Sequence, residues 1–84
     1  MTLSILIVED NELNRRLFSH VLARSGFGVE EAADGQSALA AATRTKPAVI
    51  VLDMELPDLP GLEVLRRLRS DPALGSTPIL VVSA

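Results

Sequence analysis

The chain has 84 residues, of which 48% are hydrophobic and 23% are charged, and its formal net charge is −3. A chain of this length corresponds to one domain. Its apolar runs are far shorter than the roughly 18 residues of a membrane span, and its mildly acidic charge provides no basic face for nucleic acid. Cysteine is absent, which excludes disulfides and thiolate metal sites. Met1 leads directly into an apolar segment without the basic region of a signal peptide, so we expect a cytoplasmic domain with no direct nucleic-acid or membrane partner.

The first half of the chain predicts two strands separated by a helix. Residues 3–8 are a short, β-branched apolar run, which is typical of a buried strand. Over residues 11–25, leucine, phenylalanine and valine recur at helical spacing, and Gly26 or Gly28 is expected to end this amphipathic helix. Residues 29–32 are short and half polar, which favours a strand at the edge of a sheet.

The second half repeats the alternation of strands and helices. An alanine-rich helix is predicted over residues 36–43, and a second buried strand over residues 48–52 leads into Asp53. After a proline-rich loop, residues 62–71 place leucines on one side of a helix and arginines on another. Residues 79–82 form a last, wholly apolar strand.

This alternation indicates an α/β fold: a doubly wound parallel sheet with helices on both faces. The three apolar strands favour central positions and the half-polar second strand favours an edge, which predicts the strand order 2-1-3-4. No repeat or low-complexity linker interrupts the chain, so we expect one domain over residues 1–84.

Acidic residues follow the two strands that this order places side by side. Glu9 and Asp10 come after the first strand and Asp53 after the third, and ligands of such sheets bind where the strand order reverses. Three neighbouring carboxylates repel one another unless protons or a cation intervene. Oxygen ligands without histidine or cysteine suit Mg²⁺, and one carboxylate at such a site can act as a nucleophile toward phosphorus.

Each of these residues also has a purely structural interpretation. Glu9 and Asp10 could cap the following helix, and Asp53 could shape a turn. Ser83 could be an ordinary residue after a strand. Separate turns need not bring their acids to one switch point, and the convergence therefore favours a functional site.

Three spaced motifs resemble the receiver domains of two-component response regulators. They are ILIVEDN at residues 5–11, VLDMELP at residues 51–57 followed by Gly61, and PILVVSA at residues 78–84. Together they extend over nearly the whole chain. The resemblance implies a flavodoxin-like fold and a phosphorylation-dependent signalling switch that is not an enzyme.

The resemblance also implies a role for each site residue. Asp53 is the expected phosphoacceptor, and Ser83 is expected to hydrogen-bond the phosphoryl group. The expected Mg²⁺ ligands are the carboxylates of Glu9, Asp10 and Asp53 and the backbone carbonyl of Glu55. The expected donor is a phosphohistidine on a sensor histidine kinase or a histidine phosphotransfer protein. In the family that donor docks on the first helix, where the exposed arginines and Asn14 are candidate contacts. The alternative is that these residues form an ordinary solvated face.

The chain departs from the family at its end. Receiver domains similar to it continue with a fourth helix, a fifth strand that ends in a phosphate-pairing lysine, and a fifth helix. Lys46 is the only lysine, and it precedes the third strand, far from the expected site. Residues 79–82 would then be a bare apolar edge that invites self-association. A fragment of a longer protein, an exchange of elements between copies and a naturally short product all remain as explanations.

Other functions fit the sequence less well. A receiver-like docking module that works without phosphorylation is the main alternative. An enzyme of the aspartyl-phosphatase type is a second alternative, since Asp53-Met54-Glu55 partly resembles its motif. That motif has a second aspartate two residues after the nucleophile, where this chain has Glu55, so the match is weak. A nucleotide-binding fold would need a glycine-rich loop after the first strand, where this chain has acids.

Overall fold

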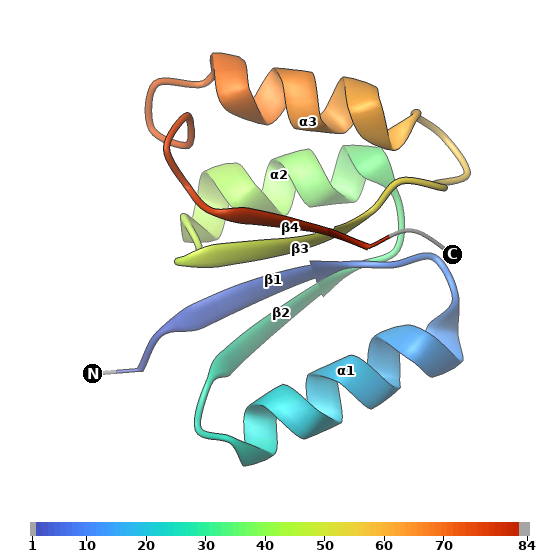
Figure 1. Ribbon diagram of the computed structural model, residues 1–84, viewed down its shortest axis with the longest axis vertical. Helices are drawn as coiled ribbons and strands as arrows, with labels where there is room; N and C mark the ends of the chain where they lie inside the picture. Colours follow the sequence, from blue (N-terminus) through green and yellow to red (C-terminus); the bar gives the residue numbers. More distant parts are fainter. Residues whose placement is uncertain (1, 83–84) are drawn as a thin grey trace.

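A computed structural model describes residues 2–82, in which four strands form a parallel sheet of order β2-β1-β3-β4 and three helices connect them (Figure 1). The elements are β1 (Ser4–Val8), α1 (Glu12–Arg24), β2 (Gly28–Ala32), α2 (Gly35–Thr45), β3 (Val49–Asp53), α3 (Gly61–Ser70) and β4 (Ile79–Val82). The predicted α/β class and strand order are confirmed. None of these helices has the length and hydrophobicity needed to cross a bilayer.

Side-chain caps set where two of the helices begin. Asn11 Oδ1 accepts the Asn14 N–H at 2.9 Å at the start of α1, and Asp34 Oδ1 accepts the Ser37 N–H at 2.8 Å at the start of α2. Such caps satisfy backbone donors that the helix itself leaves free. Helix α2 extends beyond the predicted residues 36–43 at both ends, and Lys46 stops it in a left-handed conformation with φ 46°.

A glycine closes the turn between α1 and β2. Gly26 has φ 97°, a conformation that a residue without a Cβ adopts at little cost. The prediction named Gly26 or Gly28 for this role, and Gly28 instead begins β2.

The main hydrophobic core lies between the sheet and the two helices α2 and α3. Leu6, Ile50 and Leu52 project from the sheet into this core, and α3 contributes Val64 and Leu68. Full burial of a side chain of this size stabilises the fold by about 1.5–3 kcal/mol. This face of the molecule therefore holds most of the apolar burial.

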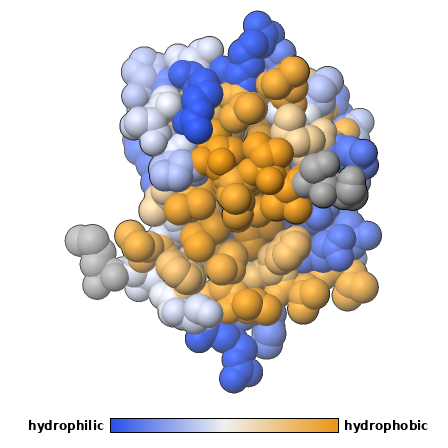
Figure 2. All heavy atoms as spheres, in the orientation of Figure 1, coloured by the Kyte–Doolittle hydropathy of each residue, from blue (hydrophilic) through white to orange (hydrophobic). Residues whose placement is uncertain are grey.

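The opposite face of the sheet is covered by α1 alone within the described residues (Figure 1). This helix contacts β2 and β1 and contains no buried residue. Leu80 of β4 is 60% exposed, and Leu17 and Val21 of α1 are also exposed. Figure 2 shows the resulting hydrophobic surface in the middle of the molecule, between α1 and α3.

One glycine brings the start of α3 against the loop that follows β3. The N–H of Gly61 donates to the carbonyl oxygen of Met54 at 3.1 Å. A Cβ added at Gly61 would lie 2.8 Å from that oxygen and would also contact the Met54 Cα. Because Met54 directly follows Asp53, the missing side chain of Gly61 helps to fix the backbone beside the acidic residues.

Gly61→Ala should therefore lower the free energy of unfolding by about 1–3 kcal/mol, the usual cost of an overpacked site. The matched control is Gly28→Ala, since the nearest side-chain atom to its added Cβ, Thr2 Cγ2, would be 3.6 Å away. The control should change stability by no more than about 0.5 kcal/mol. Urea denaturation of both variants measures the difference, and equal stabilities would contradict the close approach.

Candidate functional site

Three carboxylates meet where β1 and β3 end. Glu9 and Asp10 follow β1, Asp53 ends β3, and one carboxylate oxygen from each lies within 4.8 Å of the others. The two strands are neighbours in the sheet, at the point where the strand order reverses. The predicted convergence of these acids is confirmed.

A hollow of about 280 Å³ opens beside the three carboxylates. Its lining combines the acids with residues of α1, of the loop after β3 and of the end of β4: Glu9, Asp10, Asn11, Asn14, Phe18, Asp53, Glu55 and Val82. The sequence pattern had placed Phe18 on the apolar side of α1, with no sign that it would border a polar site. Its position at the hollow depends on how far α1 is rotated over the sheet, which helical spacing alone does not determine.

Glu9 is the deepest of the three acids, with 8% of its surface exposed. Burial raises the pKa of its carboxyl, and contacts with Asp53 and Asp10 raise the pKa further. The backbone N–H of Asn11 donates to Glu9 Oε2 at 3.2 Å and partly offsets these effects. Glu9 therefore holds its proton more tightly than a free glutamate does when no cation is present, as expected for crowded carboxylates.

The structural interpretations of these acids are only partly correct. The N-cap of α1 is Asn11 and not Glu9 or Asp10. Asp53 does shape a turn, because its Oδ1 accepts the Glu55 N–H at 3.0 Å. That hydrogen bond leaves acceptor capacity on the Asp53 carboxylate, so the turn and a functional role are compatible.

The donor set is of the kind that holds Mg²⁺. In the part of the chain that the structure describes, the group consists of three carboxylates without histidine or cysteine, which matches the preference of this hard cation for oxygen. A cation would also relieve the crowding that raises the pKa of Glu9. The expected ligation by the Glu55 carbonyl stays a prediction, and Ser83 lies outside the described residues.

An unpredicted contact fixes the loop that follows Asp53. Both carboxylate oxygens of Asp58 accept backbone N–H groups at the start of α2, from Gly35 at 2.7 Å and from Gln36 at 2.9 Å. The N–H of Leu59 is a third donor, at 2.8 Å. These donors, Gly35 first, lower the pKa of Asp58. The sequence showed an acid in a loop, but it could not show that the loop reaches a helix in another part of the chain.

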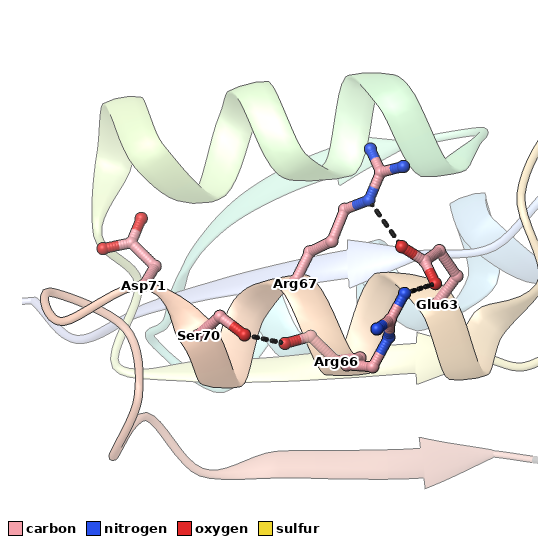
Figure 3. Close-up of a pocket in the computed structure, with 5 residues that line it drawn as sticks. All are labelled: Glu63, Arg66, Arg67, Ser70 and Asp71. Atoms are coloured by element: carbon pink, nitrogen blue, oxygen red, sulfur yellow. Dashed lines mark hydrogen bonds and ion pairs between the residues drawn. The ribbon is translucent and has the colours of Figure 1, made fainter.

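A second hollow lies on the outer side of α3 and is lined by Glu63, Arg66, Arg67, Ser70 and Asp71 (Figure 3). Glu63 pairs there with two arginines, including Arg67 Nε at 2.8 Å. These pairs, Arg66 first, lower the pKa of Glu63. Exposed pairs of this kind are an ordinary feature of a helix surface, and we place no site here.

The only lysine of the chain does not serve the acidic site. Lys46 caps the C-terminus of α2, just before β3 begins. The acids lie at the other end of β3, as the sequence predicted.

Comparison with known proteins identifies relatives of the whole chain. The family profile described as "Response regulator receiver domain" matches residues 5–84. The polar-differentiation response regulator DivK of Brucella ovis is 40% identical over 84 residues, which is 100% of this chain and 68% of DivK. The structure of the chemotaxis response regulator CheY4 of Vibrio cholerae has a TM-score of 0.93 at 36% identity, covering 96% of this chain and 68% of that one. A receiver domain (CheY-like) from Methylobacillus flagellatus has a TM-score of 0.90 at 29% identity, over 99% of this chain and 70% of that one.

The raised pKa of Glu9 has a consequence for stability. The folded state holds the Glu9 proton more tightly than the unfolded chain does, so this contribution to stability is fully present below pH 4.5, the ordinary pKa of the group, and is lost as the pH rises through the folded-state pKa. Glu9→Gln should therefore raise the melting temperature at neutral pH, without divalent cations, because the neutral amide removes the crowded charge.

Thermal unfolding followed by circular dichroism between neutral pH and pH 4 measures this effect. The advantage of Glu9→Gln should shrink as the pH falls through the folded-state pKa of Glu9, and it should be gone below pH 4.5. Glu12→Gln, at an exposed carboxylate on α1, is the control and should melt like the wild type. A Glu9→Gln variant that is no more stable than the wild type at neutral pH would contradict the assignment of a crowded, buried acid.

Proposed function

Because the chain belongs to the response regulator receiver domain family, we propose that it is a phosphorylation-dependent switch in which Asp53 accepts a phosphoryl group. Receiver domains are signalling modules of two-component systems and not turnover enzymes, as the sequence predicted. The observation that supports the proposal best is the position of Asp53 within 4.8 Å of both Glu9 and Asp10. An isolated turn residue would have no need of such neighbours.

The proposed reaction transfers a phosphoryl group from histidine to aspartate. A carboxylate oxygen of Asp53 attacks phosphorus, a P–O bond forms, and the P–N bond to the donor imidazole breaks. The imidazole nitrogen keeps the electron pair of that bond and takes up a proton. Glu9, Asp10 and Asp53 would hold Mg²⁺, which neutralises charge on the phosphoryl oxygens when it is bound.

Two further residues complete the proposed site. The backbone carbonyl of Glu55 would supply another Mg²⁺ ligand, and the Ser83 hydroxyl would donate a hydrogen bond to the phosphoryl group. Glu55 borders the same hollow as the acids, which supports the first of these roles. For Ser83 the support is the sequence motif and its place directly after β4.

The proposed donor is a sensor histidine kinase or a histidine phosphotransfer protein that docks on α1. Asn14 and Phe18 of this helix border the hollow that contains Asp53, so a partner on α1 could bring its phosphohistidine to the acid. Arg16 is 69% exposed and open to such a partner. Action in the cytoplasm, where these donors present their phosphohistidines, remains a prediction.

Treatment with acetyl phosphate and MgCl₂ tests the phosphoacceptor. Intact-mass measurement should show a gain of one phosphoryl group on the wild type, and none on Asp53→Asn or after chelation of Mg²⁺ with EDTA. Asp71→Asn, at the far end of α3 from the acids, is the matched control and should gain the group as the wild type does. A wild type that never gains mass would overturn the proposal and favour a docking module that works without phosphorylation.

We also propose that two copies of the described domain associate through β4. Within residues 2–82 this strand is hydrogen-bonded to β3 only, so backbone groups on its other side are free to pair with an added strand. A groove of about 450 Å³ runs beside it, and its lining contains no charged residue: Leu17, Phe18, Val21, Leu22, Val51, Leu80 and Val82. Two such surfaces can meet without like-charge repulsion, and a twofold axis would pair β4 with β4 in antiparallel fashion.

Leu80→Lys should weaken this association, because the side chain of Leu80 lies in the groove and is 60% exposed. Sedimentation velocity over a range of concentrations should show a monomer–dimer equilibrium for the wild type. The dissociation constant of the variant dimer should be at least tenfold higher, which corresponds to about 1.4 kcal/mol. Leu62→Lys changes a leucine that is 65% exposed on α3 and should behave as the wild type. A wild type that stays monomeric at every concentration and melts cooperatively would refute the association.

A further inference from the structure

Arg15 has the least exposed side chain among the arginines of α1. The helix has no buried residue, yet only 15% of the Arg15 side chain is exposed, compared with 69% for its neighbour Arg16. Arg15 lies on the side of α1 that faces the sheet, close to the end of β1. Its position calls for an explanation, because burial of a charged group is unfavourable unless it is paired.

The guanidinium of Arg15 bridges two elements of the sheet. Nη1 donates to the backbone carbonyl oxygen of Glu9 at 3.0 Å, and Nε donates to Glu31 Oε1 on β2 at 3.1 Å. Charge-assisted hydrogen bonds of this kind are among the stronger ones in proteins. Arg15 thus connects α1, the residue after β1, and β2 through one planar group.

These contacts hold the backbone of Glu9 from both sides. Its N–H donates to the carbonyl oxygen of Ala32 at 3.0 Å, and its carbonyl accepts from Arg15. With both backbone groups engaged, neither of the two peptide planes that flank Glu9 can rotate freely. The carboxylate of Glu9 and the adjacent Asp10 are then presented toward Asp53, where the three acids lie within 4.8 Å of one another.

We propose that Arg15 is a positioning residue for the cation site: by fixing the Glu9 carbonyl against β2, it sets the geometry of Glu9 and Asp10. The inference rests on the proposed Mg²⁺ site. It assigns to Arg15 a role through backbone geometry, without contact with the cation.

A role through charge alone makes the opposite prediction. A positive group near the acids repels Mg²⁺, so removing that charge would strengthen cation binding. Removing a positioning contact should weaken binding, because the carboxylates are then less well placed. Arg15→Met removes the charge and both hydrogen bonds while keeping an unbranched side chain, and the direction of the change distinguishes the two roles.

Titration of the ¹⁵N-labelled protein with MgCl₂, followed by amide chemical shifts, provides the measurement. Arg15→Met should weaken Mg²⁺ binding by about tenfold, at the lower end of what the loss of an outer-shell partner costs a metal site. Arg15→Lys keeps the charge but cannot reproduce both hydrogen bonds of the planar fork, so its affinity should lie between those of Arg15→Met and the wild type. Arg24→Met removes an exposed arginine in the last turn of the same helix and should bind Mg²⁺ as the wild type does.

The possible results separate the two proposals. If the wild type binds Mg²⁺ and Arg15→Met binds it equally well or more tightly, the positioning role is wrong and the cation site stands. If the wild type shows no Mg²⁺-dependent shifts, the cation site is wrong and the role of Arg15 falls with it. Thermal unfolding of each variant verifies that it is folded, and Arg15→Lys alone decides the matter if Arg15→Met does not fold.

Discussion

The pairing of β1 with β3 is the constraint on which the site depends. In their parallel register Val8 lies opposite Leu52, so the residues that follow, Glu9 and Asp53, leave the sheet side by side. A shift of one residue would turn the side chains of a strand to the other face and separate the acids. The fold thereby holds together carboxylates that would move apart in a free chain. The resulting electrostatic cost is borne by the rest of the domain, mainly by the core under α2 and α3.

The fold and the centre of the site were predictable from the sequence because both depend on strong local patterns. The β-branched run of residues 3–8 and the alternation with amphipathic helices indicated the fold class, and the half-polar second strand beside three apolar ones indicated the strand order. The acids stood directly after two strands, and parallel strands end at a common edge, so the convergence of Glu9, Asp10 and Asp53 followed. Helix ends were less predictable. The start of α2 depends on the cap by Asp34, which the apolar pattern of that helix does not indicate.

The contacts that brace the site were not predictable, because each joins residues distant in sequence. Asp58 reaches the start of α2 across 23 and 22 residues, and Arg15 reaches Glu31 across 16. In the sequence these are one more acid in a loop and one more arginine on a polar helix. Their partners depend on loop conformation and helix rotation, which periodicity does not specify. The role of Ser83 depends on residues outside those that the structure describes.

The unequal covering of the two sheet faces divides the domain into a firm part and a labile part. Helix α1 has no buried residue, whereas α2 and α3 each bury several, and local opening requires least free energy where apolar burial is smallest. The acidic cluster lies on the boundary: Asp53 belongs to the firm part, and Glu9 is tied to α1 through Arg15. A partner that binds α1 would therefore act on the helix with the least apolar burial. A movement of α1 would reach Glu9 through Arg15, while Asp53 would stay with the better-packed part of the domain.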